Sequence, residues 1–350
     1  MKFLLSILLF FALTSTAQVP SVAMNMTATK MEPGVLIAGN ALSVFDKAAL
    51  AKDSMNCKSA RMAFIISTWN GSSASYEAYR AKGLNLIPNI NYYPTGSVQP
   101  FVVASLLANF KSVLTDILNT YPDIKTICVE NEELTKSYHS GPLTDYVAEV
   151  KAAYEVCHPR GVLVMNGGFG GVHSGLDIKV YRWLQTISQA KADDYGTHMG
   201  NAVLNAANSF GSNDNQEKYA RQLDTLEAMR PYIDFLNFHT KESQDPNNTD
   251  PSNTTTVTPN MLMDKADYLR SRYGRWLADN ETGQFNNQPA LVSAEMNEYL
   301  RLGFVVVQWW SGTGPDGDEG TQAQPLHDDE TGDLFPNGRV FNTFNYNLNK

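Results

Sequence analysis

The sequence predicts an α/β protein built as a single (β/α)8 TIM barrel. The first observation is that short β-rich runs alternate with helical patterns from about residue 34 to the C-terminus, an alternation typical of parallel strands joined by helical crossovers. The second is that eight β-rich runs occur, which is the number that closes a TIM barrel. A doubly wound open sheet uses the same alternation and is the alternative architecture.

The N-terminus has the organisation of a secretory signal peptide. Lys2 precedes an apolar run over residues 3–13, and small residues follow up to Ala17, so a signal peptide over 1–17 is predicted. The run is shorter than the roughly 20 residues of a membrane-spanning helix. We therefore expect an extracellular or periplasmic protein that leaves the membrane after cleavage. An uncleaved N-terminal anchor is the alternative.

Composition narrows the class of the remaining chain. The 350 residues are 43% hydrophobic and 18% charged, enough for a large core, and no linker or repeat divides residues 18–350. The net charge of −9 argues against a nucleic-acid or anionic-membrane partner. The three cysteines are too few for a disulfide scaffold and form no metal-binding pattern. The sequence does not indicate an oligomeric state.

Each expected strand is a short apolar run. The eight strands are expected at 34–39, 62–68, 84–91, 125–131, 162–166, 233–239, 290–295 and 304–310. Helical patterns lie between them at 101–120, 143–157, 178–191, 216–229 and 259–273. Long polar segments at 192–215, 241–258 and 311–333 are expected to surround the C-terminal face of the barrel, where TIM-barrel active sites lie.

Three polar residues occupy the expected C-terminal ends of strands. Alternation along the strands directs Glu132, His239 and Glu295 toward the barrel axis. A carboxylate in such a place is costly unless it is paired or functional, and two facing carboxylates are what glycoside hydrolysis requires. The alternative is that each glutamate pairs with Arg or Lys, or lies solvated on a loop.

The motifs around these residues resemble those of clan A glycoside hydrolases. Residues 129–132 (VENE) resemble the Asn-Glu motif of strand four, residues 289–295 (PALVSAE) are similar to the segment of strand seven that ends in the nucleophile, and residues 304–310 (FVVVQWW) resemble strand eight. The tail at 332–346 is similar to the turn and final helix that close those barrels.

The resemblance implies a retaining hydrolase that cleaves a β-linked oligo- or polysaccharide by double displacement, without a cofactor or metal. Glu132 would be the acid/base and Glu295 the nucleophile, while Asn131 would bind the sugar 2-hydroxyl and His239 would donate a hydrogen bond from strand six. Two features depart from the clan: Glu133 stands where Pro is frequent, and the strand-two Arg of several families is not apparent. The individual family is therefore not identified.

Flat aromatic rings near the expected strand ends are candidates for stacking on sugars. These are Trp69 after strand two, Tyr92 after strand three, and Trp309 and Trp310 at the end of strand eight, with Trp310 favoured as the inward one. The amides of Asn91 and Asn237 are candidates for binding hydroxyls. The alternative interpretation places one ring of each aromatic pair in the core and the other on the surface, and makes the amides a polar layer inside the barrel.

Two other functions fit the same residues. A non-catalytic carbohydrate-binding barrel would keep the aromatic cleft without turnover. A metal-dependent hydrolase would use His139, His198, His239 or the Asp-rich loops as ligands, and would be sensitive to chelators.

Overall fold

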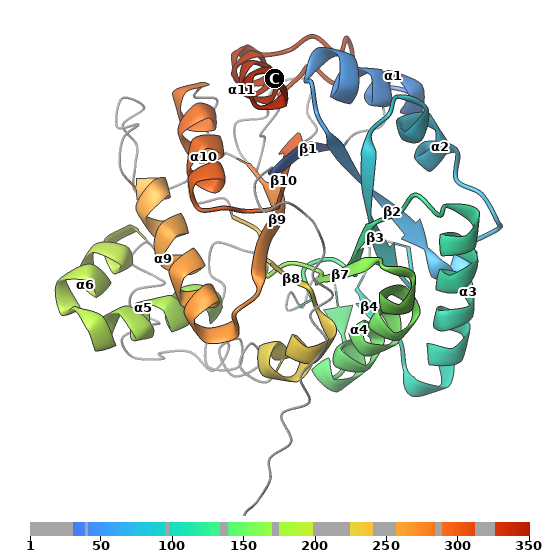
Figure 1. Ribbon diagram of the computed structural model, residues 1–350, viewed down its shortest axis with the longest axis horizontal. Coiled ribbons are helices and arrows are strands. Elements are labelled where there is room, and N and C mark those ends of the chain that lie inside the picture. The colour runs from blue at the N-terminus through green and yellow to red at the C-terminus, as the bar shows by residue number, and fades with distance from the viewer. Residues whose placement is uncertain are drawn as a thin grey trace, which may run out of the picture.

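Eight parallel strands form a closed barrel in the computed structural model, which confirms the predicted (β/α)8 fold (Figure 1). The structure describes residues 31–38, 41–94, 98–133, 139–169, 175–198, 225–240, 257–283, 289–311 and 326–350. The strands run in the order β1-β10-β9-β8-β7-β5-β3-β2. Their bounds are β1 Glu32–Ile37, β2 Ser59–Ile65, β3 Asn85–Asn91, β5 Thr126–Val129, β7 Leu163–Asn166, β8 Phe235–Asn237, β9 Trp276–Thr282 and β10 Val306–Ser311. Two short strands, β4 Gln99–Pro100 and β6 His139–Ser140, pair separately.

Helices surround the strands (Figure 1). Their bounds are α1 Val44–Ala49, α2 Ala74–Ala81, α3 Leu107–Thr120, α4 Leu143–Cys157, α5 Gly175–Ile187, α6 Gln189–His198, α9 Val257–Tyr273, α10 Pro289–Arg301 and α11 Pro336–Asn349. Serine side chains cap two of them: Ser43 accepts from the backbone N–H of Asp46 in α1, and Ser73 accepts from that of Tyr76 in α2. No described helix is long and apolar enough to cross a membrane.

The seventh strand was predicted at the wrong place. Residues 290–295 belong to helix α10, and the strand before it is β9. The buried residues of α10 are Leu291, Val292, Glu295, Met296 and Tyr299, a spacing that matches one face of a helix rather than one face of a strand. The other seven predicted strands are confirmed, each shifted by no more than a few residues.

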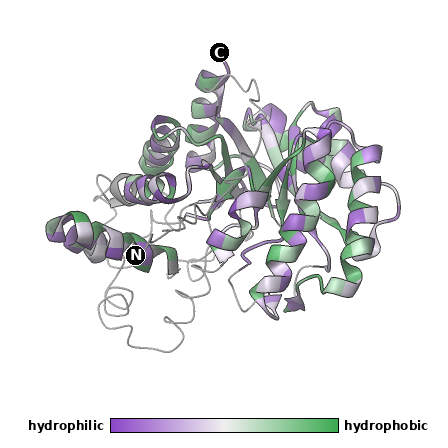
Figure 2. Ribbon diagram, turned by 60° about the horizontal axis from the view of Figure 1, so that its bottom comes forward, coloured by the Kyte–Doolittle hydropathy of each residue, from purple (hydrophilic) through white to green (hydrophobic). Residues whose placement is uncertain are grey.

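The barrel interior is built in layers. An apolar layer contains Ile87, Cys128, Met165, Phe235, Ala278 and Val306, one residue from each of six strands. Moving two positions toward the C-terminal ends of the strands gives a polar layer that includes Asn89, Asn237, Asn280 and Gln308, all buried. In Figure 2 the strands are mostly coloured as hydrophobic, whereas the helices carry both hydrophobic and hydrophilic bands. The polar layer forms the floor of the site described below.

Candidate active site

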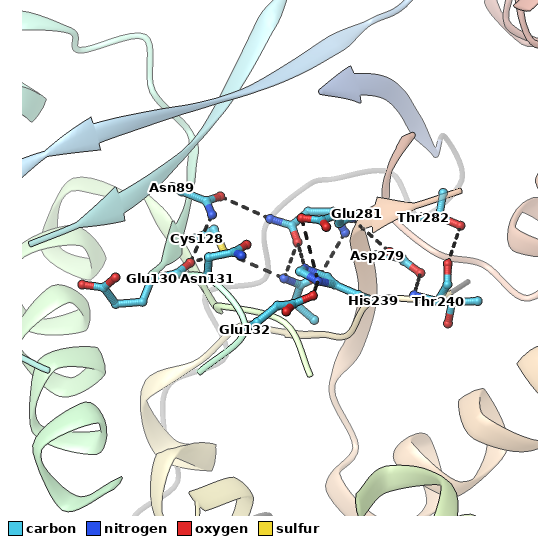
Figure 3. A network of polar contacts seen from close by, with 12 residues as sticks. Asn89, Cys128, Glu130, Asn131, Glu132, His239, Thr240, Asp279, Glu281 and Thr282 are labelled. Atoms are coloured by element: carbon cyan, nitrogen blue, oxygen red, sulfur yellow. Dashed lines mark hydrogen bonds and ion pairs between the residues drawn. The ribbon is translucent and has the colours of Figure 1, made fainter. Parts of the chain in front are cut away.

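Three side chains from three strand ends meet above the polar layer: Glu132 after β5, His239 after β8 and Glu281 in β9 (Figure 3). His239 Nδ1 lies 3.0 Å from Glu132 Oε1 and 3.9 Å from Glu281 Oε2. One ligating atom of each residue lies within 4.8 Å of those of the other two. Both glutamate side chains are 12% exposed and His239 is 1% exposed, so the cluster is nearly desolvated but reachable. The predicted positions of Glu132 and His239 at this mouth are confirmed.

Glu281 is held by an arginine that the sequence analysis missed. Arg61 Nη1 lies 2.6 Å from Glu281 Oε2 and also donates to the backbone oxygen of Asn280 at 2.9 Å. Its Nη2 donates to Asn131 Oδ1, and its Nε donates to Asn89 Oδ1 at 3.1 Å. Arg61 therefore connects the expected acid/base loop to the end of β9. It was missed because β2 was expected to begin at residue 62, whereas it begins at Ser59.

The asparagines of the polar layer fix the orientation of His239. Asn237 Nδ2 donates to Asn280 Oδ1 at 2.7 Å, and Asn280 Nδ2 donates to Asn89 Oδ1 at 3.3 Å. Because Asn280 Oδ1 is an acceptor, His239 Nε2, at 2.8 Å from it, carries a proton. Nδ1 then faces Glu132, and one proton lies between this nitrogen and Oε1 of Glu132. The His239–Glu132 contact therefore holds a proton next to the carboxyl group of the expected acid/base.

Electrostatics favour the charged form of His239. Burial alone would lower the pKa of its imidazole, but the charge of Glu281, together with the hydrogen bond and charge of Glu132, outweighs burial and raises that pKa. The imidazole therefore lies between two carboxylates whose charges favour its protonation.

The loop carrying Glu132 does not continue the alternation of the strand. Glu130 and Glu132 have positive φ angles of 61° and 45°, which non-glycine residues rarely adopt. The Glu130 side chain points away from Glu132 and His239 (Figure 3) and accepts from the backbone N–H of Tyr92 at 2.8 Å. Its second partner is the carboxyl group of Glu149 on α4. This buried pair anchors the loop from behind.

The Glu130–Glu149 pair should make stability depend on pH. Burial raises the pKa of Glu130 to about 7, and burial together with the charge of Glu130 raises the pKa of Glu149 well above its ordinary value. Since both folded-state pKa values lie above the unfolded values, their contribution to stability is present at low pH and is lost as pH rises through about 7. We expect Glu149→Gln, which holds a donor permanently, to raise the Tm at about pH 8 by about 2 to 4 °C and not at about pH 5. Thermal unfolding at both pH values tests this, and an equal shift at both would contradict it.

Glu133, which stands where Pro is frequent in the resembling clan, is also buried. Its Oε1 accepts from Asn166 Nδ2 at 2.8 Å, and burial raises its pKa to about 7. Glu133 is fully buried, whereas Glu132 lies at the mouth, so Glu132 stays the predicted acid/base.

Glu295 is not at the barrel mouth. It lies on α10 with 1% exposure, and its Oε1 is 2.5 Å from Thr282 Oγ1. Tyr299 of the same helix donates to Asp279 Oδ2 at 2.6 Å. These contacts place Glu295 between α10 and the outer face of β9. The register of β9 against β10 shifts between Asp279 and Thr282, so that Asp279 and Thr282 both contact α10 whereas Glu281 lies at the mouth. The nucleophile prediction for Glu295, which depended on its being at a strand tip, is therefore wrong.

Three predicted stacking residues face the helices instead. Trp309 is 1% exposed and packs against Phe341 of α11, with ring centroids 5.8 Å apart. Trp69 donates to Asp116 of α3 at 2.6 Å, and the hydroxyl of Tyr92 accepts from Asn109 of α3 at 3.2 Å. The predictions that these rings bind substrate are wrong.

Trp310 alternates with Trp309 and shares its face with the inward Val306 and Gln308, as predicted. It is half-buried, and its stacking on sugar stays a prediction.

The predicted amides divide into two groups. Asn131 contacts Arg61 at the mouth, and Asn91 is buried at the end of β3 with no hydrogen-bond partner for Oδ1 among the described residues. Their binding of hydroxyl groups stays a prediction. Asn237 is wrong as a substrate contact, because it is fully buried and bonded to Asn166 and Asn280 within the polar layer. It supports the site from below.

Gly168, after β7, leaves the space that His239 occupies. It has a φ of +101°, and a Cβ on it would lie 2.2 Å from His239 Nε2. We expect Gly168→Ala to displace the imidazole and lower kcat by about a hundredfold, as positioning errors of about 1 Å do. Gly161→Ala is the matched control, since its φ is also positive (+68°) but its Cβ would meet nothing within 4 Å. The kcat of both variants is measured by steady-state kinetics. Equal losses of kcat would show that strain of the backbone, and not displacement of His239, causes the effect.

Several expected features lie outside the described residues. These are the signal peptide at 1–17, most of the polar segments at 192–215, 241–258 and 311–333, and the side chain of His198. Of the other histidines proposed as metal ligands, His139 stacks on Phe101 and its Nε2 lies 2.7 Å from the backbone oxygen of Asn131. Only His239 belongs to the cluster of potential metal ligands found in the described part of the chain.

Solved structures similar to this fold include several glycoside hydrolases. The chain superposes with a TM-score of 0.55 on a family 39 glycoside hydrolase from Bacteroides cellulosilyticus WH2, at 14% identity over 90% of this chain and 63% of that one. It superposes with a TM-score of 0.57 on a glucosidase from Croceicoccus marinus, at 11% identity over 92% and 68%. A GH5-4 broad specificity endoglucanase from Clostridium longisporum gives 0.53, at 13% identity over 89% and 88%.

At these identities the likeness shows the fold, and the chain spans less than two thirds of the Bacteroides enzyme. No protein-family model matches the sequence, and no curated protein matches it.

Proposed function

We propose that the protein is a retaining glycoside hydrolase in which Glu132 is the acid/base and Glu281 is the nucleophile. One observation carries the proposal: carboxylate oxygens of Glu132 and Glu281 approach within 4.8 Å across the barrel mouth. Retaining enzymes hold their two carboxyl groups about 5 to 5.5 Å apart, whereas inverting enzymes need roughly 6.5 to 9.5 Å to admit a water molecule. The spacing supports double displacement.

In the first step a Glu281 oxygen attacks the anomeric carbon, and the bond to the leaving oxygen breaks as Glu132 transfers its proton to that oxygen. In the second step Glu132, now ionised, removes a proton from water, and the water oxygen displaces Glu281 from the sugar. The proton lost from Glu132 in the first step is restored in the second. Arg61 balances the charge of Glu281 before attack, and His239 holds Glu132 toward the leaving group.

The proposed substrate is a β-linked oligo- or polysaccharide. Support comes from the carboxylate pair, from the half-buried Trp310 on the inward face of β10, and from the names of the structural neighbours, which include a glucosidase and an endoglucanase. Export through the signal peptide at 1–17 is part of the proposal. N-terminal sequencing of protein recovered outside the cytoplasm would test it, because an intact Met1 there would contradict cleavage.

The activity is tested with a panel of aryl β-glycosides and β-linked polysaccharides, with the anomer of the first product followed by NMR. We expect the β-anomer to form first, as retention requires. Initial release of the α-anomer would overturn double displacement. Binding of glycans without hydrolysis of any panel member would instead favour the carbohydrate-binding barrel.

A further inference from the structure

We propose that the mouth of the barrel is also a binding site for one zinc-class divalent cation, held by Glu132, His239 and Glu281, and that the cation competes with substrate. The inference rests on the proposed function only for the competition, since the binding itself depends on the three side chains alone. The ligand atoms lie within 4.8 Å of one another, and the two closest separations to His239 Nδ1 are 3.0 and 3.9 Å. Zinc bonds of about 2.0 to 2.2 Å place tetrahedral ligands roughly 3.3 Å apart, so small side-chain adjustments suffice.

The imidazole is oriented as a metal ligand. Its Nε2–H donates to Asn280 Oδ1 at 2.8 Å, and that oxygen is fixed in turn by Asn237. A hydrogen bond donated by Nε2–H selects the tautomer in which Nδ1 carries the lone pair. Metal-binding histidines usually make such a hydrogen bond with the ring nitrogen that does not bind the metal. The free lone pair of neutral His239 is on Nδ1, which faces both carboxylates.

The donor set and its charge select the kind of cation. One imidazole and two carboxylates suit zinc, copper or nickel, whereas calcium and magnesium prefer six or more oxygen ligands. Two ionised carboxylates and the guanidinium of Arg61, 2.6 Å from Glu281 Oε2, leave a formal charge of −1. Arg61 opposes the cation, which limits affinity. A fourth position remains for water at the mouth, where both glutamates are 12% exposed.

The same carboxylate oxygens perform the proposed hydrolysis. A bound cation therefore displaces the proton of Glu132 and occupies the attacking oxygen of Glu281, and both catalytic groups are blocked. The site therefore predicts inhibition by zinc that chelators reverse. It does not predict a requirement for zinc.

Zinc chloride is titrated into chelator-treated full-length protein by calorimetry. We expect one zinc per chain, with the association constant lowered by about a hundredfold in His239→Asn and in Glu132→Gln, since each removes a ligand or its charge. Glu132→Gln preserves shape and guards against misfolding of the histidine variant, and His158→Gln, a histidine remote from the barrel mouth in the turn after α4, is the matched control. Binding unchanged in both ligand variants, or undetectable at about millimolar zinc, would overturn the site.

Competition is read separately with whichever glycoside the panel identifies. We expect zinc to raise KM and leave kcat unchanged, and EDTA to restore the original KM. Hydrolysis that stops in EDTA and returns with zinc would overturn competition and favour the metal-dependent hydrolase. If no glycoside is turned over, the calorimetric result still decides the metal site, so failure of the proposed activity is distinguishable from failure of this inference.

Discussion

Glu281→Ala is expected to lower kcat by roughly 10⁴- to 10⁶-fold, the range seen when a nucleophile that acts as part of a catalytic unit is removed. The loss arises because the attacking oxygen is gone, while Arg61 and the polar layer remain. Glu132→Ala is expected to lower kcat by about 10²- to 10⁴-fold, with smaller losses for aryl glycosides whose leaving groups need no protonation. Steady-state kinetics on aryl glycosides of graded leaving-group acidity measures both effects.

Azide distinguishes the two roles chemically. In Glu281→Ala the cavity admits azide, which attacks the β-glycoside directly and gives the α-glycosyl azide. In Glu132→Ala azide attacks the glycosyl-enzyme and gives the β-glycosyl azide. The opposite pair of products would exchange the two assignments.

Glu295→Gln is the matched control for Glu281→Ala. It changes a buried carboxyl that contacts Thr282 behind β9, and we expect kcat to stay within about tenfold of the wild type. A loss of kcat in Glu295→Gln as large as that in Glu281→Ala would favour Glu295 on α10 as the nucleophile, and would contradict the assignment of Glu281.

The error over the seventh strand has a physical cause. Strand β9 carries Asp279, Asn280 and Glu281 in succession, so its sequence lacks the apolar alternation that identifies a strand. Asn280 is paired with the polar layer and Asp279 with Tyr299 and the backbone of Thr240. These partners lie on other elements, and the local sequence contains no sign of them.

The beginning of α10 was predicted as a strand because it has the apolar residues that β9 lacks. Residues 290–295 form a short run of apolar and small residues that ends in a glutamate, and only the wider window through Tyr299 shows the helical spacing. By contrast, Glu132 and His239 follow strands that are clearly apolar, so their places at the strand ends were predictable, although the loop after β5 does not continue the alternation. Arg61 lies within a run, 59–65, whose other residues are apolar or small. A lone charge inside such a run is the signal that would have identified it, since a buried guanidinium needs a carboxylate partner.

Arg61 is the residue on which the electrostatics of the site depend. Arg61→Met removes the arginine partner of the buried Glu281, and breaking a buried ion pair in this way costs about 3 to 5 kcal/mol of stability. Because an ionised nucleophile is then harder to maintain, the acidic limb of the kcat/KM profile is expected to move to higher pH. Arg80→Met is the matched control, since the pair of Arg80 with Asp123 is half exposed and surface pairs contribute about 0 to 1 kcal/mol.

Arg61→Lys separates charge from geometry. The ammonium keeps the positive charge, so the acidic limb is expected to stay near its wild-type position. A lysine does not reproduce the planar set of donors that contacts Glu281, Asn131 and Asn89 together, and kcat is therefore expected to fall by about a hundredfold. pH–rate profiles of the two variants beside the wild type measure both effects. If the acidic limb moves equally in Arg61→Lys and Arg61→Met, the arginine acts by geometry alone, and the charge balance assigned to it at Glu281 is wrong.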